Sequence, residues 1–169
     1  MALDILRNSI LSVDGFVIPG TVDVKVPSIK LKTEKMYLGG ADGETEVDFG
    51  LQALEAGMKL GTVNRTVLAN VGLRPGITKT FNFDGYTVSE VNGQVLGVNI
   101  RVTGKIREDD PGTWKHGDKS EWDYKIMCST YKLMFGDAVI YDIDPKNFIR
   151  VIDGVDQLAE IRRAMRRAF

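Results

Sequence analysis

Apolar and polar residues alternate along most of this chain, which is the pattern of half-buried β-strands. Val22, Val24 and Val26 alternate with Asp23 and Lys25, for example, so that one face of the strand is apolar and the other polar. About nine such segments follow one another at short spacing, as is typical of an antiparallel β-sandwich or barrel. The predicted strands are 9–13, 16–18, 22–26, 29–38, 46–60, 81–91, 98–107, 122–130 and 138–143.

Glycine-containing turn dipeptides separate many of these segments. Asp14-Gly15 and Asn92-Gly93 are strong hairpin signals because both residues of each pair tolerate positive φ, and Asn92-Gly93 predicts a type I′ turn. Pro19-Gly20 and Gly136-Asp137 mark further turns. Strands joined by such short turns pair with each other in antiparallel fashion.

Segment 46–61 fits two patterns. Some of its apolar residues have helical spacing, but all of them also fit two consecutive strand registers. Gly50, Gly57 and the lack of an N-cap residue disfavour the helix. We therefore predict one long strand with a bulge at 52–53, and a second bulge or bend near 33–35, where the apolar residues change parity.

The sequence predicts two short helices. Asn64 can cap a helix over 65–71, which Gly72 ends and Pro75 blocks. The second helix occupies the C-terminal segment 156–169.

Asp156 is the predicted N-cap of this second helix, whose apolar and basic residues separate onto two faces. Three interpretations stay open: the helix docks on its own domain, it contacts a membrane surface or nucleic acid, or it docks on a neighbouring subunit. We expect docking, either on its own domain or on a neighbour. The predicted docking face is Leu158, Ile161, Met165 and Phe169, opposite Arg162, Arg163, Arg166 and Arg167.

Composition narrows the class of protein. A chain of 169 residues with 43% apolar residues can bury one core, so we predict a single domain over 1–169. The 22 basic and 23 acidic side chains give a net charge of −1, which argues against a general electrostatic grip on nucleic acid. The single cysteine, Cys128, fits a reducing cytoplasm. Because no segment has the pattern of a membrane span or a signal peptide, we expect neither membrane insertion nor Sec export.

Residues that could carry chemistry are few. Only Cys128 and His116 could form a Cys-His dyad, and the strand pattern around Cys128 favours a buried structural thiol. The count of histidines and cysteines excludes a zinc site built from them. We predict no catalytic, cofactor-binding or metal-binding residues, and no enzyme activity.

Two acidic clusters offer alternatives to this prediction. The trio 108–110 could serve acid–base chemistry or bind a hard cation, but no pocket residues recur around it, which favours a solvated charge cluster. Asp142 and Asp144 precede Pro145, which favours turn initiation over metal binding.

A flexible acidic loop over 39–46 has no apolar anchor. It lacks the ligand spacing and closing glutamate of an EF-hand, and no Gly-Lys-Ser/Thr follows as in a P-loop. A metal loop or a projecting contact arm fits this composition, and we favour a loop that is mobile or ordered by a partner. The predicted contact residues are Gly39, Gly40, Ala41, Asp42, Gly43 and Glu44.

The strongest sequence blocks are DPGTWK at 110–115, TYKL at 130–133, YDIDPKN at 141–147 and IDGVDQL at 152–158. Together with weaker blocks at 26–35, 39–40 and 48–55, they resemble the major tail tube proteins of P2-like contractile-tailed phages and the related tube proteins of R-type pyocins. The blocks occur in family order along nearly the whole chain. The arginine-rich end, 162–169, departs from the family pattern.

The resemblance implies a structural protein of the virion, assembled in the host cytoplasm, whose hexameric rings stack into the inner tube of a contractile tail. Each subunit would be a β-sandwich or partly open barrel with a short flanking helix at 64–71. The polar faces of strands 46–60 and 98–107 would line a wet lumen, and the loop 39–46 would be an arm between rings.

The implied partners are further copies of the chain, the tail sheath protein, the tape measure protein in the lumen, and the baseplate hub and tail terminator at the ends. DNA would pass through the lumen only as transient cargo during ejection, and no cofactor or membrane contact is expected. The alternative is the tube of an R-type bacteriocin (tailocin) or of a related contractile secretion system, which differs in its cargo.

Overall fold

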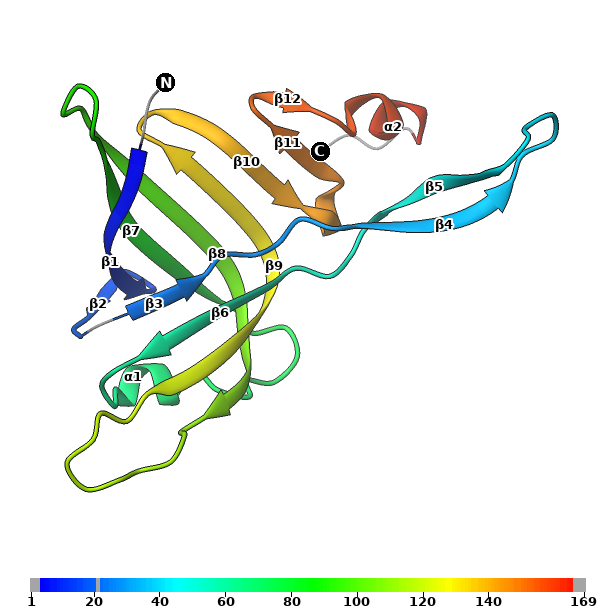
Figure 1. Ribbon diagram of the computed structural model, residues 1–169. Helices are drawn as coiled ribbons and strands as arrows, with labels where there is room; N and C mark the ends of the chain where they lie inside the picture. Colours follow the sequence, from blue (N-terminus) through cyan, green and yellow to red (C-terminus); the bar gives the residue numbers. More distant parts are fainter. Residues whose placement is uncertain (1–3, 21, 166–169) are drawn as a thin grey trace.

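The computed structural model describes residues 4–20 and 22–165, which form a mainly β structure with two short α-helices and one 3-10 turn (Figure 1). Ten strands belong to one antiparallel sheet, and two form a separate two-stranded sheet. The strands are β1 (Asp4–Val13), β2 (Phe16–Ile18), β3 (Val22–Lys25), β4 (Leu31–Tyr37), β5 (Glu44–Leu51), β6 (Glu55–Leu60), β7 (Lys79–Ser89), β8 (Val95–Asp110), β9 (Trp122–Phe135), β10 (Ala138–Asp144), β11 (Ile149–Ile152) and β12 (Val155–Asp156). The helical segments are α1 (Arg65–Leu68), η1 (Pro145–Asn147) and α2 (Ala159–Ala164).

Six strands curl into a partly open barrel in the order β1-β7-β8-β9-β6-β3. The two end strands, β1 and β3, approach each other without forming a ladder, and the Ser9 hydroxyl donates a hydrogen bond to the Val22 carbonyl oxygen at 2.9 Å. The predicted mainly antiparallel β-fold, a sandwich or a partly open barrel with two short helices, is confirmed.

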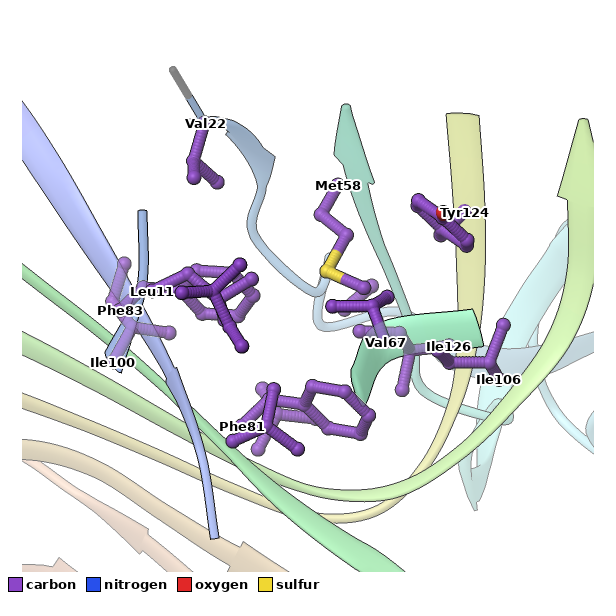
Figure 2. Close-up of a cluster of buried hydrophobic side chains, with 14 of the residues drawn as sticks. Leu11, Val22, Met58, Val67, Phe81, Phe83, Ile100, Ile106, Tyr124 and Ile126 are labelled. Atoms are coloured by element: carbon purple, nitrogen blue, oxygen red, sulfur yellow. The ribbon is translucent and has the colours of Figure 1, made fainter. Parts of the chain in front are cut away.

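The core fills the inside of this barrel, where side chains from facing strands meet (Figure 2). Leu11, Phe81 and Phe83 come from β1 and β7, and Ile126 comes from β9, all at most 1% exposed. Val67 of α1 joins the same cluster and is fully buried, so the helix covers part of the barrel. Burying each large apolar side chain stabilises the fold by roughly 1.5–3 kcal/mol.

Strand β9 changes its buried face halfway along. Trp122, Tyr124 and Ile126 are buried, as the alternation predicts, and Cys128 is partly buried against the same core, but the predicted continuation to Thr130 is wrong. The β8–β9 register shifts at this point, leaving Ser129 without an opposite residue, so Tyr131 is the next buried side chain. Beside this bulge β9 also changes its second neighbour from β6 to β10.

Segment 46–60 is extended, as predicted, but it is not one strand. The break at 52–54 separates β5 from β6, and the two strands belong to different sheets. β5 pairs only with β4, whereas β6 pairs with β3 and β9 inside the barrel. The β4–β5 register shift lies between Leu31 and Thr33, next to the predicted bend. The alternation predicted the strands but could not show that their partners differ.

The structure tests the two hairpin turns that were predicted from Asp-Gly and Asn-Gly dipeptides. Asp14 and Gly15 both have positive φ, 49° and 86°, and join β1 to β2 as predicted. The type I′ turn predicted at Asn92-Gly93 is wrong: only Gly93 has positive φ, and its amide donates to the Ser89 carbonyl at 2.8 Å. The β7–β8 connection is therefore a longer loop over 90–94.

The first helix is capped as predicted but is shorter. The Asn64 side chain accepts a hydrogen bond from the Thr66 amide at 2.8 Å. The helix ends at Leu68, three residues before the predicted end, and Val71 instead forms a parallel bridge with Ile106.

The C-terminal helix begins later than predicted. Asp156 pairs with Val151 in the β11–β12 ladder, which holds it in extended backbone, so Leu158 rather than Asp156 is the N-cap of α2. The Asp156 carboxylate accepts from the Leu158 amide at 3.1 Å and pairs with Arg162. The described helix is 159–164, and Phe169 of the predicted 156–169 helix lies outside the described residues. Among the described residues, no helix has the length and apolarity needed to cross a membrane.

Candidate functional site

The candidate catalytic pair does not form a site. Cys128 lies half-buried in β9, where its Sγ is 3.5 Å from the Ile126 carbonyl oxygen. Burial raises the pKa of the Cys128 thiol to about 12, so at neutral pH it is a thiol and not a nucleophilic thiolate. His116 lies in the exposed loop 111–121, and the structure shows no hydrogen bond between it and Cys128.

The acidic residues 108–110 also fail to converge. They end β8, so their side chains alternate between its two faces. Glu108 pairs with Lys125 at 2.9 Å, and the Asp110 carboxylate accepts from the Gly112 amide at 2.9 Å. Asp109 is opposite Tyr124, whose pKa is raised to about 12 by burial first and by the Asp109 charge second. The three carboxylates of residues 108–110 therefore have different surroundings and do not form one site.

The two aspartates around the Pro145 turn have separate partners. Asp142 pairs with Lys132 across the β9–β10 ladder at 3.5 Å. Asp144 caps η1, because its carboxylate accepts from the Asn147 amide at 3.2 Å. Within the described part of the chain, no group of three or more His, Cys, Asp or Glu side chains could hold a metal ion.

The most prominent surface feature is the arm, which we define as the β4–β5 hairpin over 31–51. It projects away from the barrel in Figure 1. Residues 38–43 form its tip, so the acidic loop is shorter than 39–46, and Glu44 already belongs to β5. Nearly the whole arm is exposed, including Tyr37 at 74% and Phe49 at 54%.

The arm has two different faces and little internal support. Strand register places Thr33, Lys35 and Tyr37 directly opposite Asp48, Glu46 and Glu44, which makes one polar face. The other face carries Met36 and Val47. The base is fastened by the Gln52 amide, which donates to the Lys30 carbonyl at 2.8 Å. An isolated two-stranded hairpin is marginally stable in water, so the arm has little stability of its own beyond the contacts at its base.

The C-terminal module, which we define as residues 145–165, presents the predicted docking face to solvent. Leu158 is half-buried, while Ile161 and Met165 are 47% and 44% exposed. Ile161 and Met165 are therefore largely accessible to solvent, whereas Leu158 is partly covered.

Arg162 was predicted on the solvated face of α2, but it is a structural residue. It donates to the Phe148 carbonyl at 2.6 Å and pairs with Asp156, which ties α2 to the turn after η1. The hydrogen bond from Arg162 is the main cause that lowers the pKa of the Asp156 carboxyl.

A groove runs between the base of the arm and the C-terminal module, with a volume of about 450 Å³. Phe49 and Leu51 line it from β5, and Leu158 and Ile161 line it from the module. Arg150 of β11 lines it as well, and its Nε atom is buried without a hydrogen-bond partner among the described residues.

The barrel's outer face is polar across β7, β8, β9 and β10. Arg101 donates from Nε to the Asn82 side chain at 2.9 Å, and Asn99 donates to Asp84. With the Lys132–Asp142 pair, these contacts make a polar, hydrogen-bonded surface.

Both ends of the ten-stranded sheet leave open strand edges. β2 ends it on one side and carries the exposed Phe16 and Val17, and β12 ends it on the other with exposed Val155. Open edges and exposed apolar residues favour pairing with another chain. Sequence analysis missed Phe16, Val17 and Arg150, because two-residue apolar steps and a lone arginine carry no periodic signal.

Comparison with known proteins gives consistent results. The family model for phage tail tube protein FII matches residues 4–165. The chain is 35% identical over 153 residues to the major tail tube protein of Serratia phage KSP20, covering 88% of this chain and 87% of that protein. It is 27% identical over 143 residues to the tail tube protein of Escherichia phage P2, covering 83% of each chain.

Solved structures show the same fold at low sequence identity. A chain of the sheath/tube terminator of an extracellular contractile injection system, PVC, matches with a TM-score of 0.56 at 13% identity, over 75% of this chain and 92% of that one. A chain of the PVC sheath-tube complex matches with a TM-score of 0.55 at 13% identity, over 75% and 87%. The match over almost the whole sequence is to structural proteins rather than enzymes, and the chain belongs to the phage tail tube protein FII family.

Proposed function

We propose that this chain forms hexameric rings that stack into the inner tube of a contractile phage tail, through which DNA passes during ejection. The similarity to two phage tail tube proteins over more than four fifths of the chain carries this proposal. The protein is then a virion component, needs no cofactor, and has no membrane contact.

The barrel's outer face across β7–β10 is our candidate for the lumen wall. This surface is polar. Its basic side chains Lys132 and Arg101 already have partners on the surface, Asp142 and Asn82. A wall of this kind lets a polyanion slide instead of holding it. Of the two predicted lumen strands, 98–107 contributes to this surface. Segment 46–60 does not, since 46–51 belongs to the arm and 55–60 forms β6 beside the first half of β9.

Lateral closure of a ring uses the open strand edges. An edge contact between different surfaces of successive copies is heterologous, and it closes into a ring when the rotation allows. β2 and β12, at opposite ends of the sheet, supply two such edges.

The segment Gly39 to Glu44, which is most of the arm tip and the first residue of β5, is our candidate for contacts between rings. It is exposed, it projects from the barrel and it contacts no other part of its own domain at its end (Figure 1). Leu158, Ile161 and Met165 form the second candidate contact face, and Phe169, which was assigned to the same face, lies outside the described residues.

If the chain forms the tube of a contractile tail, it has further protein partners. The outer surface would contact the sheath protein, the lumen would hold the tape measure protein during assembly, and the ends would meet the baseplate hub and the tail terminator. The tube of an R-type bacteriocin or a contractile secretion system is the alternative, with the same subunit and a different cargo.

Negative-stain electron microscopy of the purified protein tests the proposal directly. We expect rings of six subunits or long hollow tubes that grow with protein concentration. A protein that stays monomeric at high concentration and in the presence of its sheath partner would contradict it.

A further inference from the structure

The groove between the arm base and the C-terminal module has an unusual lining for a solvent-exposed surface. Phe49 and Ile161, both about half exposed, and the half-buried Leu158 give it an apolar floor. Arg150 also lines the groove, and its Nε atom is buried without an acceptor among the described residues. A buried donor without a partner is costly, so the groove is suited to a ligand that combines apolar groups with a carboxylate.

The arm has the complementary composition. Within 31–51 there are two lysines and five acidic residues, a net side-chain charge of −3. Its end carries Tyr37 and Leu38, which are 74% and 47% exposed, followed by the carboxylates of Asp42 and Glu44. In contrast, the C-terminal module, residues 145–165, contains four basic and three acidic side chains, a net charge of +1.

An arm cannot fill its own groove. The seven residues of β4 extend roughly 23 Å at about 3.3 Å per residue, so the tip lies far from the groove at the base of the same hairpin. Asp48 is the acidic residue in the lining of the groove. Its carboxylate already accepts a hydrogen bond from the Gly50 amide at 2.6 Å, so it is engaged within its own strand. Only a second copy of the chain can bring an arm tip to this position.

We propose that the tip of the arm of one subunit docks in the groove of another, with Tyr37 and Leu38 on the apolar floor and an acidic side chain on Arg150. This docking rests on the proposed tube function, and it identifies the groove as the surface that binds the arm tip. The contact is heterologous, since tip and groove are different surfaces, so it propagates from copy to copy instead of closing a pair.

A mixed-cysteine experiment tests the contact between copies. Tubes are assembled from equal amounts of an Ala41→Cys chain and an Ile161→Cys chain and then oxidised, so that a disulfide between these positions can form only between two subunits. We expect a disulfide-linked dimer in the mixture. The matched control replaces Ala41→Cys with Asn92→Cys on the exposed β7–β8 loop, which should give little dimer. Native Cys128 is half-buried with a raised pKa and reacts slowly.

A charge reversal tests the role of Arg150. We expect Arg150→Glu to raise the protein concentration needed for tube assembly about tenfold or more, since a charge-assisted contact is lost and repulsion is gained. Adding Asp42→Lys and Glu44→Lys to that variant should restore assembly. Arg163→Glu, a reversal at an exposed arginine of α2, is the control and should assemble normally.

The outcomes are distinguishable. Wild-type tubes together with normal assembly of Arg150→Glu and no mixed dimer overturn the docking and leave the tube function standing. Absence of rings and tubes in the wild type overturns the tube function itself. If circular dichroism shows that Arg150→Glu does not fold, the mixed-cysteine result alone decides.

Discussion

At the scale of single residues, the fold depends on a few positions where backbones approach closely. Gly104 of β8 lies beside the bulge of β9, and a Cβ at this position would overlap the Met127 carbonyl oxygen. Gly97 lies in the same strand, and a Cβ there would meet open space. The two glycines therefore separate the effect of close approach from the effect of glycine in a strand.

We predict that Gly104→Ala lowers the free energy of unfolding by about 1–3 kcal/mol, because the two strands must move apart at the bulge. Gly97→Ala should leave stability unchanged or raise it slightly, since alanine restricts the unfolded chain. Urea denaturation of both variants measures this. Equal stability of the two variants would mean that β8 and β9 relax at the bulge without cost.

A second residue-scale prediction concerns pH. Arg162 lowers the pKa of the folded-state Asp156 carboxyl below its value of about 3.9 in an unfolded chain. The pair therefore stabilises the fold fully above this unfolded value, and the stabilisation disappears as pH falls through the folded pKa.

Consequently, Asp156→Asn should be less stable than wild type at pH 7, and the difference should shrink below about pH 4. Urea denaturation over a pH series measures it, with Asp118→Asn in the exposed 111–121 loop as the control. A stability difference that stays constant down to pH 2 would show that the charge of Asp156 is not what ties α2 down.

At the scale of elements, the sequence predicted strand positions better than strand partners. Alternation located most strands, and Asp14-Gly15 identified its hairpin, because both signals are local. The division of 46–60 between arm and barrel depends on which strands lie beside it, and no local residue encodes that. Arg162 and Asp156 were misassigned for the same reason: the ladder to Val151 holds Asp156 in β12.

For the candidate contact surfaces, the sequence revealed composition but not geometry. The acidic residues of 39–46 and the apolar face of α2 are visible in the sequence. The groove that combines Phe49 with Ile161 and Arg150 joins segments about 100 residues apart, so only the fold shows it.

An element-scale prediction concerns the arm. Deleting residues 40–44 should leave the thermal unfolding temperature of the isolated subunit nearly unchanged, because the tip packs on nothing in its own domain. The same deletion should abolish long tubes in negative-stain images while rings persist. Normal tubes after the deletion would show that the tip does not connect rings.

At the scale of the whole molecule, charge is balanced rather than concentrated. The net charge of the chain is −1, and on the polar surface of the barrel Lys132 pairs with Asp142 while Arg101 is hydrogen-bonded to Asn82. Tight binding of nucleic acid needs several unpaired basic groups placed along one surface.

We therefore predict that assembled tubes bind duplex DNA with dissociation constants weaker than about 10⁻⁶ M at physiological salt, which is the range of non-specific contacts. Fluorescence anisotropy with a labelled duplex, repeated at several salt concentrations, measures this. A nanomolar complex would contradict a lumen through which DNA passes freely.

The continuity of β9 has a consequence for unfolding. Its first half holds β6 in the barrel and its second half holds β10, and through β10 the whole C-terminal module, so one covalent backbone crosses both regions. Because both regions share β9, neither can lose this strand without disrupting the other. Barrel and module should therefore unfold together, in a single thermal transition.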